Sequence, residues 1–201
     1  MTLARHLRLG CLVSGGGRSV MNLQDRIDRG ELPATIAVVV ATRPGVPAIE
    51  RARARGLRVA EIGPAPKETL DDRVDAALQS AQVDLVVLAG YLRLFRPTAW
   101  AGRSINIHPA LLPRHGGKGL WGHHVHEAVL AAGDHESGCT VHWVDGQYDH
   151  GAQILQRRCP VMPGDTPDTL AARVFAEELE ALPEAIRRIG SGLVSPAGAH
   201  G

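Results

Sequence analysis

The sequence predicts an α/β fold in which a single domain is built on a doubly wound, mostly parallel sheet. Short apolar runs recur along the first half of the chain, and a longer stretch of mixed polarity follows each of them. Strands covered by helices on both faces are apolar along their whole length, so these runs are typical of a parallel sheet. Strand and helix alternate four times, which is the pattern of a doubly wound layer.

The first half of the chain supplies four predicted strands and three predicted helices. The strands are Leu9–Val13, Ile36–Ala41, Asp84–Ala89 and, with a weaker pattern, Leu57–Ile62. The helices are Val20–Arg29, Ala48–Arg55 and Lys67–Ala81. No aromatic residue precedes Tyr91, so this half must pack through Val, Leu, Ile and Ala side chains.

The second half is less regular. Its predicted strands are Ser104–Ile107, Gly138–Val144 and Ala152–Val161, and a Gly-, Pro- and His-rich loop covers 108–122. A helix over His123–Ala132 is expected to end at Gly133. A long amphipathic helix, Thr169–Ile189, contains Pro183, where we expect a break or kink. These elements predict one domain over residues 1–190 and a flexible tail over 191–201.

Composition excludes several classes of protein. The 201 residues include 22 basic and 21 acidic side chains, and this balance argues against a general nucleic-acid binder. No apolar run approaches the roughly 18 residues of a membrane span, and the opening MTLARHLRLG lacks the apolar core of a secretory signal. The three cysteines show no C-x-x-C spacing, so neither a disulfide framework nor a zinc ribbon is predicted. We expect a cytoplasmic protein.

A glycine-rich segment, Ser14–Ser19, lies between the first predicted strand and the first predicted helix. Glycines there allow a tight turn that brings several amide N–H groups toward an anion, and the helix N-terminus adds a favourable partial charge. The segment matches neither the dinucleotide pattern G-x-G-x-x-G nor a phosphate loop ending in G-K-[ST]. It favours a phosphate monoester as ligand; the alternative is a tight turn without a ligand.

Eight of the ten histidines lie between His108 and His150. His123, His124 and His126 have a spacing that could place two of them on one helix face, but no nearby residue completes a familiar metal-ligand set. We predict no metal and assign these three to packing or to support of the site.

A sharper pattern is Asn106-Ile107-His108-Pro109. Strand alternation points Asn106 and His108 to the same side, at the carboxyl edge of the sheet where open α/β sheets bind ligands. An amide can donate to the oxyanion of a tetrahedral intermediate and an imidazole can move a proton, so the pair suits acyl transfer. A nearby carboxylate such as Asp149 would raise the pKa of the histidine. The alternative is a strand-end pair that satisfies only local backbone groups.

These segments together resemble the folate-dependent formyltransferases, and in particular the branch that acts on glycinamide ribonucleotide. The resemblance covers roughly Leu9 to Ile189 and is strongest in INIHPALLPRHGGKGLWGHHVHEAVLAAG, ESGCTVHWVDGQYDHGAQILQRRCPV and GDTPDTLAARVFAEELEALPEAI. It implies a Rossmann-like formyltransferase fold. It also implies transfer of the formyl group of 10-formyltetrahydrofolate to the amine of glycinamide ribonucleotide in purine biosynthesis, with that folate as cosubstrate and without a metal.

The resemblance assigns roles to particular residues. Asn106 would hold the formyl oxygen, His108 would shuttle protons, and Asp149 would tune the histidine. The folate side would involve Leu92, Arg93, Leu94 and Phe95, together with Asn106 and Asp145. The ribonucleotide side would involve Gly16, Gly17, Arg18, Ser19, Asn22 and Glu178.

The chain departs from the family pattern at three places. Extra residues separate Gly17 from Asn22, which leaves the individual phosphate contacts open. Asp71 or Asp72 stands where some members have a folate-contacting arginine, for which Arg73 is a possible substitute. Trp121 replaces a tyrosine.

Other members of the family are rival interpretations. A tRNA formyltransferase is expected to carry a C-terminal RNA-binding domain after Ile189, and a formyltetrahydrofolate hydrolase an N-terminal regulatory domain; we find neither in this sequence. A sugar-nucleotide formyltransferase is disfavoured by the glycine loop and the GGKG segment, and a non-catalytic binding module by the presence of Asn106, His108 and Asp149. We expect small-molecule substrates, no nucleic-acid or membrane partner, and a monomer or homodimer.

Overall fold

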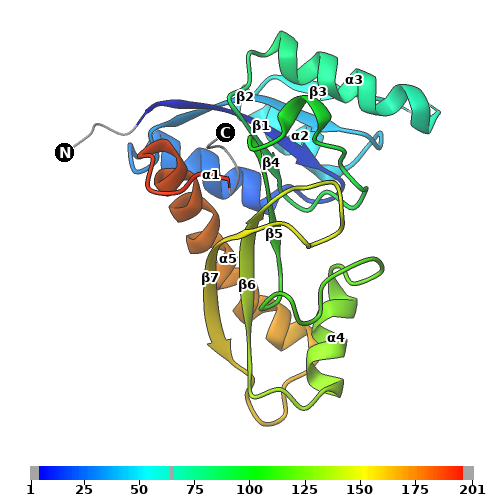
Figure 1. The fold of residues 1–201 in the computed structure, drawn as a ribbon, viewed down its shortest axis with the longest axis vertical. Coiled ribbons are helices and arrows are strands. Elements are labelled where there is room, and N and C mark those ends of the chain that lie inside the picture. The colour runs from blue at the N-terminus through cyan, green and yellow to red at the C-terminus, as the bar shows by residue number, and fades with distance from the viewer. Residues whose placement is uncertain (1–4, 64–65, 197–201) are drawn as a thin grey trace.

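The computed structural model describes residues 5–63 and 66–196 (Figure 1). In these ranges the strands are β1 Leu7–Val13, β2 Ala34–Ala41, β3 Val59–Glu61, β4 Leu85–Leu88, β5 Ser104–His108, β6 Glu136–Trp143 and β7 Gln153–Pro160. The helices are α1 Arg18–Asp28, α2 Pro47–Ala54, α3 Lys67–Ser80, α4 His123–Ala131 and α5 Pro167–Gly190, with a short 3₁₀ helix at Thr98–Trp100.

All seven strands form one sheet in the order β3-β2-β1-β4-β5-β6-β7. The pairs from β3 to β5 are parallel, and β6 and β7 extend the sheet in the antiparallel direction. The predicted α/β class with a mostly parallel sheet is therefore confirmed.

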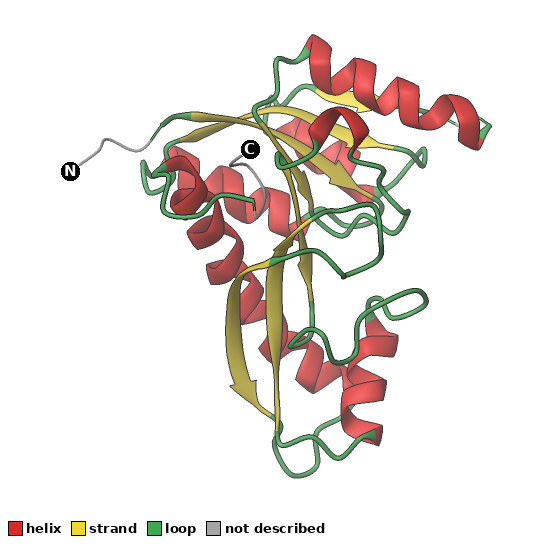
Figure 2. Cartoon of the chain, in the orientation of Figure 1, coloured by secondary structure: helices red, strands yellow, loops and turns green. Residues whose placement is uncertain are grey.

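Helices cover both faces of the sheet (Figure 2). One apolar core joins β1, β2 and β4 to α1, α2 and α5, and Leu23, Ile49 and Leu182 are among its fully enclosed side chains. A second core on the opposite face packs α3 against Leu12 and Val40. Aliphatic residues supply nearly all of the packing from β1 to β4, as the absence of aromatics before Tyr91 predicts. Figure 1 shows α5 running behind β6 and β7 toward α4.

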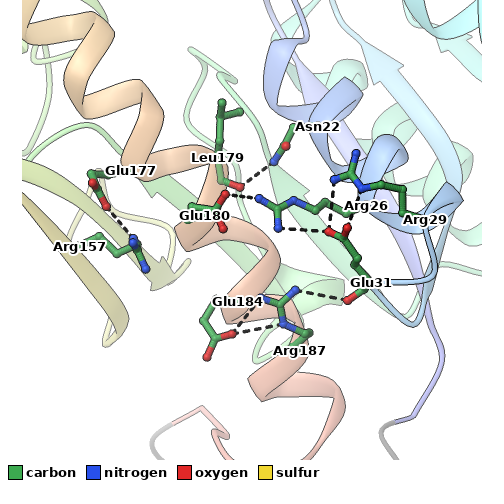
Figure 3. A network of polar contacts seen from close by, with 10 residues as sticks. All are labelled: Asn22, Arg26, Arg29, Glu31, Arg157, Glu177, Leu179, Glu180, Glu184 and Arg187. Carbon is green, nitrogen blue, oxygen red and sulfur yellow. Dashed lines mark hydrogen bonds and ion pairs between the residues drawn. The ribbon is translucent and has the colours of Figure 1, made fainter.

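Of the break or kink expected at Pro183, the break is wrong, because α5 continues from Pro167 to Gly190. Proline has no N–H, so the carbonyl of Leu179, four residues earlier, has no helical partner. The Asn22 side chain of α1 replaces it: Nδ2 donates to Leu179 O over 2.8 Å (Figure 3). A tertiary hydrogen bond thus satisfies the carbonyl that the proline leaves free.

Residues 191–196 follow α5 without regular secondary structure, and residues 197–201 of the predicted tail lie outside the described residues. Within the described ranges, no helix combines the length and apolar character that crossing a bilayer requires.

Candidate active site

A cavity of about 720 Å³ opens at the carboxyl ends of β1, β4 and β5. Helices leave the sheet toward opposite faces on the two sides of β1, so this is the crevice where open α/β sheets bind ligands. Four groups of residues form its wall: the glycine loop, the stretch after β4, the loops after β5 and β6, and one face of α5. They include Gly15–Ser19, Leu88–Phe95, Asn106–Pro109, Gly117–His123, Gln147–Asp149 and Ala171, Phe175 and Glu178.

Asn106, His108 and Asp149 meet in this cavity. Asn106 Nδ2 donates to Asp149 Oδ1 over 3.2 Å, and His108 Nδ1 lies 3.4 Å from Asp149 Oδ2. The two β5 side chains share one side of the strand, as the alternation predicts. Asp149 comes from the loop after β6, and the fold brings it to the end of β5.

Two loops approach each other closely around Asp149. Gly117 N–H donates to Asp149 Oδ2 over 3.0 Å, so the carboxylate accepts one hydrogen bond at each oxygen. A Cβ on Gly116 would lie 2.4 Å from Leu112 Cδ2 and 3.2 Å from Asp149 Cβ. A side chain at position 116 would require Leu112 and Asp149 to move, so the Gly116-Gly117 pair favours the close approach of the backbone to the carboxylate.

His142, which is 1% exposed, forms part of the same cluster and was not among the site residues predicted from the sequence. It stands directly opposite Asn106 in the antiparallel β5–β6 pair. His142 Nδ1 lies 2.8 Å from Trp143 O, an acceptor, so this nitrogen carries the proton. The other nitrogen, Nε2, then accepts from Asn106 Nδ2 over 3.1 Å. The alternation within Gly138–Val144 was the signal that could have placed His142 on the Asn106 side.

The same reasoning fixes the tautomer of His108. Its Nε2 lies 2.8 Å from the carbonyl oxygen of His115, which can only accept. The neutral imidazole is therefore protonated at Nε2, and Nδ1 carries the lone pair on the side of Asp149.

The pKa of His108 is lower than the ordinary value because burial disfavours its charged form, and this effect outweighs the opposing charge of Asp149. The expectation that Asp149 raises the pKa of His108 is therefore correct, but the net shift of that pKa is downward because burial has the larger effect. The pKa of Asp149 is also lowered: burial opposes ionisation, but it is outweighed by groups that favour the carboxylate, among them the Gly117 N–H. The free site therefore favours a neutral imidazole beside an ionised carboxylate.

The glycine loop is fixed to the stretch after β4. Ser14 N–H donates to Gly90 O over 3.1 Å, and Ser14 Oγ accepts from Leu92 N–H over 3.1 Å. Arg51 of α2 donates to Gly16 O over 2.6 Å. Two walls of the cavity are therefore held at a set distance from each other.

Gly17 begins α1 in the left-handed conformation, with φ of 69°, and a Cβ there would lie 2.7 Å from Ala48 Cβ. No side chain caps this helix and no acidic residue lies in its first turn, so its first N–H groups remain available to an anion. Arg18 adds a full positive charge, with its guanidinium carbon 3.8 Å from the centre of the Phe175 ring.

Glu178 faces this positive end of the cavity from α5. Crowding by protein raises the pKa of its carboxyl to about 7, against a partial opposing effect of Arg18. The residue is only partly buried by area, because it borders the open cavity.

Among the predicted site residues that the structure describes, Asn22 and Asp145 lie outside the cavity wall. The residues that separate Gly17 from Asn22 are helical, and Asn22 faces α5 one turn into α1. The Asp145 carboxylate holds its own loop, accepting from Gln147 N–H over 2.9 Å and contacting His150 Nδ1 at 2.6 Å. The cavity wall includes Leu92, Arg93, Leu94 and Phe95, as well as Gly16, Gly17, Arg18, Ser19 and Glu178.

The three clustered histidines do not converge. His123 and His124 are exposed and lie near Glu127, whereas His126 is 4% exposed and points into the protein. Within residues 5–63 and 66–196, no three His, Cys, Asp or Glu side chains are grouped as metal ligands. Trp121, half exposed, lies on the cavity wall with its ring edge-on to His124.

Comparison with known proteins identifies the family to which this chain belongs. The family model described as "Formyl transferase" matches residues 7–186, so the chain belongs to the formyl transferase family. The resemblance stated from the motifs is thereby confirmed.

Several members of this family are similar to the chain over most of its length. Phosphoribosylglycinamide formyltransferase of Haemophilus influenzae is 32% identical over 92% of this chain and 88% of its own length. The crystal structure of glycinamide ribonucleotide transformylase 1 from Symbiobacterium toebii has a TM-score of 0.87 at 38% identity, covering 93% of this chain and 89% of that one. The trifunctional purine biosynthetic protein adenosine-3 of Drosophila melanogaster is 36% identical over 98% of this chain, which spans 15% of that protein's length.

Proposed function

We propose that this chain transfers the formyl group of 10-formyltetrahydrofolate to the primary amine of glycinamide ribonucleotide, a step of purine biosynthesis. The observation that carries the proposal is the convergence of Asn106, His108 and Asp149 on a cavity large enough for both substrates. The names of the relatives that match most of this chain support the choice of acceptor.

The two ends of the cavity differ in chemistry, as two different substrates require. The uncapped first turn of α1, with Gly17, Arg18 and Ser19, suits the phosphate of the ribonucleotide. Glu178 can accept from hydroxyl or amine hydrogens of the same substrate. At the other end, Leu92, Leu94 and Phe95 provide an apolar wall for the folate ring system, and the backbone of this stretch provides polar groups.

In the proposed reaction the amine attacks the formyl carbon, and the bond from that carbon to the folate nitrogen breaks. One proton moves from the amine to the leaving nitrogen. His108 is neutral in the free site, with its lone pair on Nδ1, so it accepts this proton and then returns it. The imidazolium that forms lies 3.4 Å from Asp149, which stabilises it.

Asn106 stabilises the negative oxygen of the tetrahedral intermediate. Its two N–H groups donate to His142 and Asp149 in the free protein, and the formyl oxygen would take the place of one of these acceptors. Losing such a donor costs about 3–4 kcal/mol of transition-state stabilisation, or roughly 10²–10³ in rate.

The test is a spectrophotometric assay of folate product formation from 10-formyltetrahydrofolate, with and without glycinamide ribonucleotide. We expect product only with the ribonucleotide, together with the formylated amine. Product without any acceptor would instead indicate a hydrolase, and no product with both substrates would contradict the proposed acceptor.

The variant that tests the role of His108 in the same assay is His108→Ala, for which we expect less than about a tenth of the wild-type rate. Its circular dichroism spectrum should match that of the wild type, because a fold defect would also remove activity. A folded variant that retains a higher rate would remove His108 from the mechanism.

A further inference from the structure

A second histidine, His115, contacts the candidate catalytic histidine through its backbone. Its carbonyl oxygen lies 2.8 Å from His108 Nε2. His115 has a φ of 55°, in the left-handed region that residues other than glycine rarely adopt. Such a conformation persists only where surrounding contacts hold it.

The His115 side chain supplies that contact. Its Nε2 lies 2.7 Å from Asp134 Oδ2, and the two side chains are only 15% and 12% exposed. Neither residue belongs to the cavity wall. The direct contact of the pair with the site is the one from the His115 carbonyl to His108 Nε2.

Asp134 is itself fixed by the end of α4. Gly133, with φ of 67°, donates to Leu130 O, and Asp134 N–H points toward Val129 O at 3.4 Å. This is the pair of reverse bonds that closes a helix in a Schellman motif. Arg114 Nη2 approaches the other carboxylate oxygen at 2.5 Å. The carboxylate is thus a rigid anchor for the loop after β5.

We propose that His115 is a positioning residue for His108: anchored by Asp134, it holds its carbonyl against His108 Nε2. This contact keeps the proton of the neutral imidazole on Nε2, so that Nδ1 is the atom that receives a proton in the cavity. The tautomer is a property of the free protein. Only the expected effect on rate rests on the proposed formyl transfer.

Three variants separate anchoring from simple packing. His115→Asn tolerates a positive φ but is too short to reach Asp134. Asp134→Ala removes the anchor and leaves His115 in place. Asp134→Asn keeps an oxygen that can accept from His115 Nε2 and serves as the conservative rescue. Arg114→Gln is the matched control, because it removes the exposed partner of Asp134 and leaves the His115 contact.

The experiment is long-range ¹H–¹⁵N NMR of ¹⁵N-histidine-labelled protein, with His108 assigned by the signals that His108→Ala removes. We expect the Nε2–H tautomer in the wild type, in Arg114→Gln and in Asp134→Asn. His115→Asn and Asp134→Ala should show a mixture of tautomers at His108. In the transfer assay these two variants should lose roughly 10- to 100-fold in kcat, with KM for both substrates within about threefold.

An unchanged Nε2–H tautomer in folded Asp134→Ala and His115→Asn would overturn the proposal, even if their rates fell, because the role would then be structural. Should His115→Asn not fold, Asp134→Ala alone decides the outcome. If the wild type shows no formyl transfer, the NMR result still tests the positioning role, so the failure of one proposal is distinguishable from that of the other.

Discussion

At the scale of single residues, the site depends on opposing effects at His108. Burial lowers its pKa and Asp149 raises it, with burial the larger effect. A neutral imidazole can accept a proton from an attacking amine, and the ionised Asp149 then favours the charged product of that step. The carboxylate is therefore more important after proton transfer than before it.

Replacing Asp149 by Asn tests this view. We expect kcat/KM to fall about 100-fold or more, because the imidazolium loses its counter-charge. In the wild type, kcat/KM should decrease as the pH falls through the lowered pKa of His108. Asp149 raises that pKa, so its removal should move this acid limb to still lower pH. A pH profile of kcat/KM for both proteins is the measurement.

The control for this variant is Glu136→Gln at the start of β6, an exposed carboxylate paired with Arg158. Its rate should stay within about threefold of the wild type, as is usual for surface ion pairs. Movement of the acid limb to higher pH in Asp149→Asn would contradict the assignment of that limb to His108.

At the scale of elements, α1 is joined to α5 where α5 would otherwise have an unpaired backbone carbonyl. Pro183 leaves Leu179 O without its helical partner, and Asn22 donates to it. The residue before Leu179 is Glu178, which borders the cavity. Figure 3 shows this bond near the ion pair of Arg26 with Glu180, which also joins the two helices.

A double-mutant cycle of Asn22→Ala and Pro183→Ala measures this relationship. Asn22→Ala should lower the free energy of unfolding by about 1–2 kcal/mol, because Leu179 O loses its partner. In the Pro183→Ala background the restored N–H of residue 183 can donate to that oxygen, so the loss should be less than about 0.5 kcal/mol. Urea unfolding of the four proteins gives the coupling, and equal losses in both backgrounds would contradict it.

The Asn22→Ala variant also distinguishes two roles for Asn22, through its KM and its stability. A residue that contacts the ribonucleotide would change KM for that substrate, whereas a residue that holds α5 changes stability. We expect KM for the ribonucleotide to change by less than about threefold in Asn22→Ala, since Asn22 lies outside the cavity wall.

Local patterns predict the elements well and long-range contacts poorly. Apolar runs predict β1, β2 and β4, and alternation places Asn106 beside His108, because both signals depend on neighbouring residues. Asp149 required the family motif, since its approach to β5 depends on the fit of Gly116 between two loops. The expected break at Pro183 was wrong because the compensating donor lies 157 residues earlier in the chain. Asn22 was assigned to the site through the family motif, but the helical residues between Gly17 and Asn22 turn its side chain toward α5.

At the scale of the whole molecule, a substrate cavity in the sheet crevice has a cost in stability. Glu178 borders the cavity and is crowded by protein, with a pKa of about 7 against an ordinary value of 4.5. A carboxyl with a raised folded-state pKa contributes stability that is fully present below 4.5 and is lost as the pH rises through 7. The free protein should therefore lose stability between pH 5 and pH 8 because of this group.

Glu178→Gln should remove this loss, because the amide stays neutral at every pH. We expect the variant and the wild type to have similar free energies of unfolding at pH 5, and the variant to be more stable by about 1–3 kcal/mol at pH 8. The lower part of that range is favoured because Glu178 is only partly buried and solvent weakens the effect. Urea unfolding at the two pH values measures it, with Glu180→Gln as control on the same helix; that variant loses the ion pair with Arg26 and should gain no stability at pH 8. If Glu178→Gln is no more stable than the wild type at pH 8, then Glu178 is already solvated or compensated in the free protein, and the cavity does not have this cost.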